Sequence, residues 1–90
     1  GRFACGRTRV ADGPRRREAL LRLAARPPRR FDGADVLEVC RSDGLRLALE
    51  DGFVLWRASG TEPVLRVYAE APGPSRLRRR LAAGLARLDA

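Results

Sequence analysis

The sequence predicts an α+β fold of two layers, in which a mostly antiparallel sheet of four to five strands carries two helices on one face. Three observations predict this fold. Apolar and polar residues alternate along the middle of the chain, as is typical of strands with one buried face. Leucines and alanines recur at helical spacing near both ends. Short clusters of Asp, Gly, Ser and Pro separate these segments, and 90 residues suffice for a single domain over residues 1–90.

The first strand and the first helix are expected before residue 28. Residues 3–10 mix apolar and basic side chains and predict a short strand, which ends at Asp12-Gly13-Pro14. Pro14 suits the first turn of a helix, and Asp12 or Gly13 is expected to cap it. The apolar stripe of this helix consists of Ala19, Leu20, Leu23 and Ala24. Pro27-Pro28 ends the helix.

The central strands are predicted from composition and alternation. Residues 36–41 are apolar and β-branched enough to form a strand, after which Ser42-Asp43-Gly44 turns the chain. Residues 45–49 then place a leucine at every second position. Asp51-Gly52 predicts a tight hairpin into a strand over residues 53–57.

The last strand and the last helix complete the domain. Residues 64–69 place Leu65 and Val67 on one face of a strand, so Arg66 and Tyr68 are expected on the opposite, open face. Ser75 is expected to cap the final helix. The apolar stripe of that helix consists of Leu77, Leu81, Leu85 and Leu88.

The segment between the last two strands has the composition of an anion-binding loop. Ser59 and Thr61 offer hydroxyl donors, and Gly60 lets an oxyanion approach the backbone. Arg57 precedes the loop and Arg66 follows it, and either guanidinium could hold a phosphate in a bidentate contact. Gly, Pro and Ser are also ordinary turn residues, so composition alone favours a plain hairpin over an anion-binding loop.

A longer match distinguishes these two interpretations. Residues 51–71, with the motif Arg57-Ala58-Ser59-Gly60-Thr61-Glu62-Pro63 at their centre, resemble the phosphate-binding signature of the α-D-phosphohexomutases. That family includes phosphoglucomutases, phosphomannomutases and phosphoglucosamine mutases, and the signature lies in their C-terminal, fourth domain. Ala58 stands where many relatives have proline. The expected order of elements is similar to the whole of that domain.

The resemblance implies a role for each residue of the motif. It assigns substrate phosphate binding to Arg57, Ser59, Gly60 and Thr61, with Arg66 as a further candidate. We expect Glu62 to orient Arg57 or Arg66, because a carboxylate that faced a phosphate would repel it. No residue is predicted to be catalytic.

The same resemblance implies the reaction and the partners of the parent enzyme. It would be an intramolecular phosphotransferase that acts on glucose or mannose 1- or 6-phosphate through the 1,6-bisphosphate. This domain would hold the phosphate that is not reacting, close the cleft, and be inactive alone, because the phosphate-carrying serine and the Mg²⁺ loop belong to other domains of the family. No cofactor is expected in this domain.

Charge offers a rival function. The net charge is +8 and all nineteen basic residues are arginine, which would suit a basic nucleic-acid-binding module. Against that function, only five residues are aromatic, and stacking on bases requires exposed rings. A purely structural domain whose open sheet face meets another subunit is a third alternative. The motif match is more specific than bulk charge, so we expect no nucleic-acid partner.

Cysteine and histidine usage limits the remaining chemistry. Cys5 and Cys40 are the only cysteines and histidine is absent, so neither a common zinc site nor a Cys-His nucleophile can form. We expect both cysteines to be buried and reduced. The sequence has no apolar run long enough for a membrane span, and we expect a cytoplasmic protein without membrane contact.

Overall fold

The computed structural model describes residues 3–90, which form one antiparallel sheet and two helices. The elements follow the order β1 (Phe3–Ala11), α1 (Pro14–Ala25), β2 (Arg30–Phe31), β3 (Ala34–Cys40), β4 (Leu45–Leu49), β5 (Gly52–Ala58), β6 (Val64–Pro72) and α2 (Pro74–Leu88). The strand order in the sheet is β1-β6-β5-β4-β3-β2, and every neighbouring pair is antiparallel. The predicted α+β class and the antiparallel sheet are confirmed.

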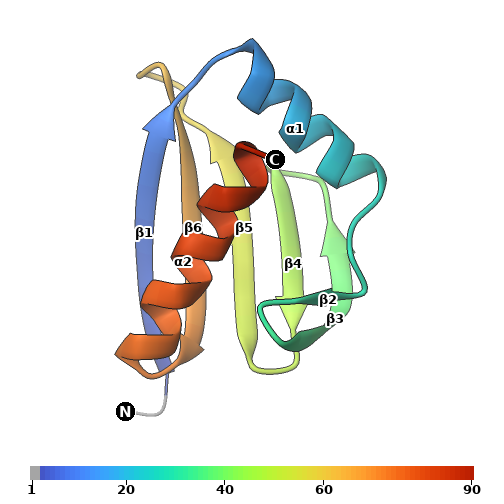
Figure 1. Cartoon of the computed structure of the whole chain (residues 1–90), viewed down its shortest axis with the longest axis vertical. Helices are drawn as coiled ribbons and strands as arrows, with labels where there is room; N and C mark the ends of the chain where they lie inside the picture. Colours follow the sequence, from blue (N-terminus) through green and yellow to red (C-terminus); the bar gives the residue numbers. More distant parts are fainter. Residues whose placement is uncertain (1–2) are drawn as a thin grey trace.

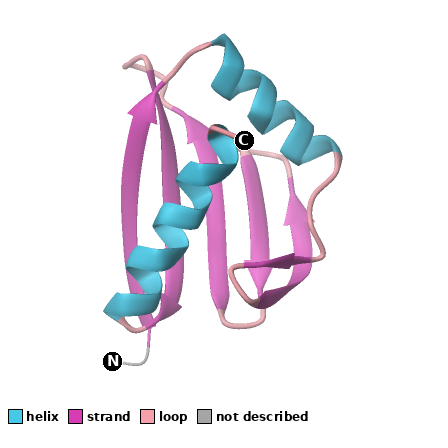
Figure 2. Cartoon of the chain, in the orientation of Figure 1, coloured by secondary structure: helices cyan, strands magenta, loops and turns pink. Residues whose placement is uncertain are grey.

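The two helices lie over the same face of the sheet (Figure 1). Helix α2 crosses β1, β6 and β5, and α1 packs against α2 near its C-terminal end. Figure 2 shows the resulting two layers, with the other face of the sheet left open. The buried core between the layers consists mainly of Leu23, Phe31, Leu45, Leu47, Leu49, Val54, Trp56, Leu65, Val67 and Leu88.

The sheet has six strands, one more than the upper bound of the prediction. The additional strand, β2, is only two residues long, and its Phe31 enters the core. Two residues carry no periodic signal, so β2 was not predicted. The hairpin between β4 and β5 is present, but its turn residues are Glu50 and Asp51, and Gly52 already pairs with Leu49.

The helix starts differ from the predicted caps. Helix α2 begins at Pro74 with Gly73 as its N-cap, and no side chain caps it, so the assignment of Ser75 is wrong. Gly13 is the N-cap of α1, as one of the two alternatives predicted, also without a side-chain cap. A proline in the first turn of each helix already removes one N–H group that would need a cap.

The expectation of buried cysteines is also wrong. Cys5 and Cys40 are free thiols, as expected, but both are exposed. Each lies on a strand at a position that faces away from the helices, because the pleat alternates and residues next to them face the core.

Helix α2 approaches the sheet very closely at Gly84. A Cβ atom added at this buried glycine would lie 2.7 Å from Cγ1 of Val67 on β6. At the same place the indole Nε1 of Trp56 donates a hydrogen bond of 2.9 Å to the carbonyl oxygen of Gly84. Glycine is therefore required where α2 crosses β5 and β6.

Candidate anion-binding site

The loop between β5 and β6 is held in a defined shape by hydrogen bonds. Ser59 N donates to the carbonyl of Val64 over 3.0 Å, and the amide of Asp12, just before α1, donates to the carbonyl of Pro63 over 2.9 Å. The hydroxyl oxygen of Ser59 accepts the amides of Thr61 and Glu62, at 3.3 and 3.2 Å. The loop is therefore ordered before any ligand binds, which lowers the entropy cost of binding.

Arg57 reaches the open face of the sheet at the end of β5. Its guanidinium donates to Oδ2 of Asp43 over 3.0 Å and to the hydroxyl of Tyr68 over 3.1 Å. Its central carbon lies 5.1 Å from the centroid of the Tyr68 ring, within range of a cation–π contact. The hydrogen bond that Arg57 donates to Asp43, followed by the one that it donates to Tyr68, raises the pKa of Arg57 above its ordinary value. Arg57 is thus a fixed positive charge.

Gly44 makes the contact between Asp43 and Arg57 possible. It has a positive φ of 78°, and an added Cβ would lie 2.1 Å from the carbonyl oxygen of Trp56. The turn between β3 and β4 can therefore approach β5 directly beside Arg57. This close approach brings the carboxylate of Asp43 to the guanidinium.

The same arginine also affects the pKa of the Tyr68 phenol. Partial desolvation raises the pKa of the Tyr68 phenol, but the hydrogen bond and charge of Arg57, together with Arg7 and Arg66, outweigh this effect and leave the pKa below its ordinary value. The phenolate form is favoured because positive charges surround the oxygen.

The titration of this phenol provides a direct test of the contact. Tyr68 is the only tyrosine, so ultraviolet difference spectra at alkaline pH report its pKa alone. We expect Arg57→Ala to raise that pKa, because the variant removes the largest stabilising contact of the phenolate. Arg78→Ala, at an exposed position of α2, should leave it unchanged. An equal pKa in the Arg57 variant and the wild type would contradict the contact.

Arg66 and Glu62 form an ion pair beside the loop. As predicted from alternation, Arg66 lies on the open face, since Leu65 and Val67 are buried. Arg66 Nη2 donates to Oε1 of Glu62 over 2.7 Å. Glu62 thus contacts one of its two expected partners, Arg66, whereas Arg57 pairs with Asp43.

The strand pairing adds an arginine from the start of the chain. Arg9 of β1 lies directly opposite Arg66 of β6, which in turn lies opposite Arg57 of β5. Arg9 Nη1 lies 3.6 Å from Oε2 of Glu62. We refer to Arg9, Arg66 and Arg57 as the arginine row. Together with the loop, it concentrates positive charge and hydroxyl donors at one edge of the open face.

The family follows from comparison with known proteins. A family model described as "Phosphoglucomutase/phosphomannomutase, C-terminal domain" matches residues 7–88, nearly the whole chain. The chain belongs to this family. The family assignment expected from the motif at residues 57–63 is therefore confirmed.

Individual proteins with related names also resemble this chain in sequence. A phosphoglucomutase/phosphomannomutase of Thermococcus kodakarensis is 42% identical over 48 residues, which are 53% of this chain and 10% of that protein. A phosphopentomutase of the same organism is 45% identical over 58 residues, 63% of this chain and 13% of that protein. The chain thus spans about a tenth of the length of these relatives.

A solved structure also resembles the C-terminal domain described here. It is a phosphoglucomutase/phosphomannomutase family protein from Burkholderia thailandensis, with a TM-score of 0.62 and 32% sequence identity. The match covers 96% of this chain and 18% of that one.

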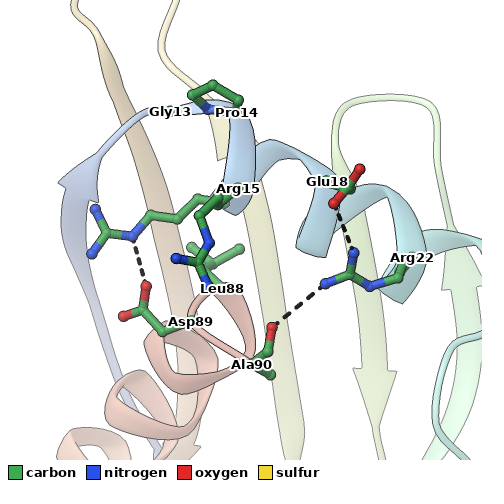
Figure 3. A pocket seen from close by; sticks show the side chains of 9 residues that line it. Gly13, Pro14, Arg15, Glu18, Arg22, Leu88, Asp89 and Ala90 are labelled. Atoms are coloured by element: carbon green, nitrogen blue, oxygen red, sulfur yellow. Dashed lines mark hydrogen bonds and ion pairs between the residues drawn. The ribbon is translucent and has the colours of Figure 1, made fainter.

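A cavity of this family member is lined by residues other than those of the arginine row, and Figure 3 shows its lining. It has a volume of about 610 Å³ and lies between the start of α1 and the end of α2. Ion pairs line it: Arg16 with Asp89 at 2.8 Å, and Arg22 with Glu18 at 3.2 Å. None of the predicted phosphate-binding residues contributes to its wall.

The part of the chain that the structure describes offers neither a metal site nor a membrane span. Among residues 3–90, no three Asp, Glu, Cys or His side chains gather into a group that could hold a metal ion. Neither helix has the length and apolarity needed to cross a bilayer.

Sequence reasoning missed two residues at the site, Arg9 and Asp43, and it placed Tyr68 on the open face without its contact to Arg57. Alternation in residues 3–10 indicates that Arg7 and Arg9 share a face, but it does not show which strand lies beside them. The pairing of β1 with β6 connects segments more than fifty residues apart. Asp43 was assigned only to a turn, and its contact with Arg57 depends on the close approach at Gly44.

Proposed function

We propose that this chain is the substrate-phosphate-binding domain of a phosphohexomutase of the phosphoglucomutase/phosphomannomutase type. The observation that carries the proposal is the position of Arg57, a fixed charge between Asp43 and Tyr68 that directly precedes a preformed loop with two hydroxyl side chains. In the parent enzyme, phosphate would pass between the 1 and 6 positions of a hexose phosphate within one active site.

Each residue of the site has a distinct role in this proposal. Arg57 and Arg66 supply positive charge and guanidinium donors for a phosphate dianion. Ser59 and Thr61 donate from their hydroxyls, and nothing lies within 4 Å of the position where Gly60 would carry a Cβ, so a phosphate oxygen can approach the backbone there. A phosphate dianion needs several such donors, because a single exposed ion pair contributes little.

The proposed role in the reaction is positioning. The domain holds the phosphate that is not reacting, so the other end of the sugar is oriented toward the groups that transfer phosphate. Closure of the domain over the cleft would exclude water from the reaction. The remaining domains of the enzyme supply the nucleophile and Mg²⁺, so the isolated chain is expected to be inactive. A cytoplasmic location remains a prediction.

The proposed ligands are glucose and mannose 1- or 6-phosphate and the 1,6-bisphosphate. The names of the relatives include a phosphopentomutase and a probable phosphoglucosamine mutase from Methanopyrus kandleri, 53% identical over 36 residues. Relatives with different named sugars thus both resemble this chain. This supports a site that binds the phosphate group rather than the sugar ring.

Nucleic-acid binding is less well supported by the arrangement of charge. Six arginines of the two helices lie within 4 Å of a carboxylate: Arg16, Arg17 and Arg22 of α1 and Arg76, Arg79 and Arg80 of α2. Paired guanidinium groups release less free energy on contact with a phosphate backbone than free ones do. The arginine-rich helices are therefore weaker anion sites than their sequence suggests.

Substitution of Arg57 tests the proposal. We expect glucose 1-phosphate to cause saturable amide shifts confined to residues 57–66 in NMR spectra of the 90-residue chain. Arg57→Ala should weaken this binding about tenfold or more, because a charge-assisted bidentate contact is lost. Arg78→Ala removes an equal charge from the exposed side of α2 and serves as the control.

The same titration with a short DNA duplex at two salt concentrations tests the rival function. Salt-dependent shifts along both helices, with residues 57–66 silent toward glucose 1-phosphate, would replace the proposed function with nucleic-acid binding. Equal affinity for glucose 1-phosphate in the Arg57 and Arg78 variants would remove Arg57 from the site.

A further inference from the structure

The arginine row places three like charges on neighbouring strands. Arg9, Arg66 and Arg57 lie directly opposite one another across β1, β6 and β5. Directly opposite residues of an antiparallel pair have Cβ atoms only about 5 Å apart, and like charges at that distance destabilise the pair. Such a row is expected to attract anions from whatever source is nearest.

Two carboxylates of the chain itself lie against the row. Asp43 contacts Arg57 at 3.0 Å, and Glu62 contacts Arg66 at 2.7 Å and Arg9 at 3.6 Å. Glu62 thus divides one negative charge between two guanidinium groups, and its longer contact, with Arg9, exceeds hydrogen-bond length. Its side chain is 46% exposed and that of Arg9 is 59% exposed, so both are accessible to a ligand in solution.

The carboxylate of Glu62 and a phosphate have the same type of preferred partner. Both accept hydrogen bonds from guanidinium groups through oxygens that share a delocalised negative charge. A phosphate dianion carries twice the charge and one more terminal oxygen, so it can contact two guanidinium groups at once. Glu62 occupies the position between Arg9 and Arg66 where such a dianion would contact both guanidinium groups.

We propose that Arg9 is a third phosphate-binding arginine and that Glu62 occupies the anion position between Arg9 and Arg66 until the phosphate of the substrate displaces it. This inference rests on the proposed function of the loop. Glu62 lies on the exposed loop, at its last position before Pro63, so its side chain can turn toward solvent while β6 remains in place. No covalent bond changes in this exchange.

The proposal makes Glu62 a competitor of the ligand. Removal of its charge, in Glu62→Gln, therefore strengthens phosphate binding. A carboxylate that only orients Arg66 would have the opposite effect, because its removal would leave the guanidinium less ordered and weaken binding. The sign of the change separates the two roles.

The experiment compares affinities for glucose 1-phosphate in the 90-residue chain by NMR titration at fixed ionic strength. We expect Glu62→Gln to bind about three- to fivefold more tightly, since loss of an exposed ion pair is a small effect. Arg9→Gln should bind about fivefold more weakly. Amide spectra outside residues 57–66 verify that both variants remain folded.

Matched controls remove the same charges elsewhere. Glu18→Gln breaks another ion pair between a glutamate and an arginine four residues later, on α1. Arg78→Gln removes one positive charge from the exposed side of α2. Any effect of net charge alone appears in these controls and is subtracted.

The outcomes separate this inference from the function on which it rests. Weaker binding by Glu62→Gln, or equal affinities in Arg9→Gln and Arg78→Gln, would overturn the inference even where Arg57→Ala weakens binding as expected. Unchanged binding in Arg57→Ala would remove Arg57 from the site, and a lack of saturable shifts at residues 57–66 in the wild type would overturn the proposed function itself. Tighter binding by Glu62→Gln together with weaker binding by Arg9→Gln would support the inference.

Discussion

Replacing Arg80 with alanine is expected to lower the free energy of unfolding by about 3–5 kcal/mol, because the change leaves the buried carboxylate of Asp32 with only a longer contact to the exposed Arg79. The side chain of Arg80 is 0% exposed, although it belongs to a run of three arginines. It donates a hydrogen bond of 3.0 Å to Asp32 and one of 2.8 Å to the backbone carbonyl of Glu70. Asp51 lies 2.8 Å away, but that contact is not aligned as a hydrogen bond and acts through charge.

Arg79 provides the control for this prediction. It also contacts Asp32, at 3.5 Å, but its side chain is 64% exposed. Arg79→Ala should therefore change the stability by about 1 kcal/mol or less. Urea titrations followed by the fluorescence of the single tryptophan measure both variants. Arg80→Met retains much of the buried aliphatic volume and isolates the loss of charge. Equal effects of Arg79→Ala and Arg80→Ala would contradict a structural role for Arg80.

Replacing Trp56 with alanine is expected to cost a similar amount, about 3–5 kcal/mol, through loss of buried apolar volume. Trp56 is 0% exposed and lies at the centre of the core. Its ring meets that of Phe31 edge to face, with centroids 5.5 Å apart and an interplanar angle of 81°. This geometry is favourable for aromatic pairs beyond the area that they bury.

Trp56→Phe separates the two contributions of this side chain. Phenylalanine keeps a ring against Phe31 but loses the hydrogen bond to the carbonyl of Gly84, so we expect a loss of about 1–2 kcal/mol. Circular dichroism in urea is the measurement for both variants, because each removes the only tryptophan. A loss below about 1 kcal/mol for Trp56→Ala would show that the core tolerates the cavity.

Local patterns were sufficient for most of the fold. The alternating leucines of β4 and the apolar stripes of the helices correspond to the buried face that the structure shows, because side-chain direction follows directly from strand and helix periodicity. The loop after Arg57 was found from its residue types, and the family from its motif, without knowledge of any contact.

Long-range contacts could not be predicted from these patterns. An arginine within a run of arginines, such as Arg80, is expected on the solvated face of a helix. Its burial depends on Asp32 and Asp51, which lie far away in the sequence. Similarly, nothing in residues 3–10 indicates that Arg9 would lie beside Arg66. Pairing of strands and burial of charge are tertiary properties, so a single sequence carries little information about them.

The close approach of α2 to β6 at Gly84 has a mechanical consequence for the open face of the sheet. Val67 meets the helix on one side of β6, while its neighbours Arg66 and Tyr68 emerge on the other side, so a single layer of backbone separates the helix from the arginine row. Any side chain larger than hydrogen at residue 84 must push against that layer. A substitution at Gly84, on the helix side of the sheet, would thereby displace β6 and with it the guanidinium group of Arg66 on the open face. If the open face binds phosphate as proposed, a substitution at Gly84 is therefore expected to change its affinity although no ligand touches that residue.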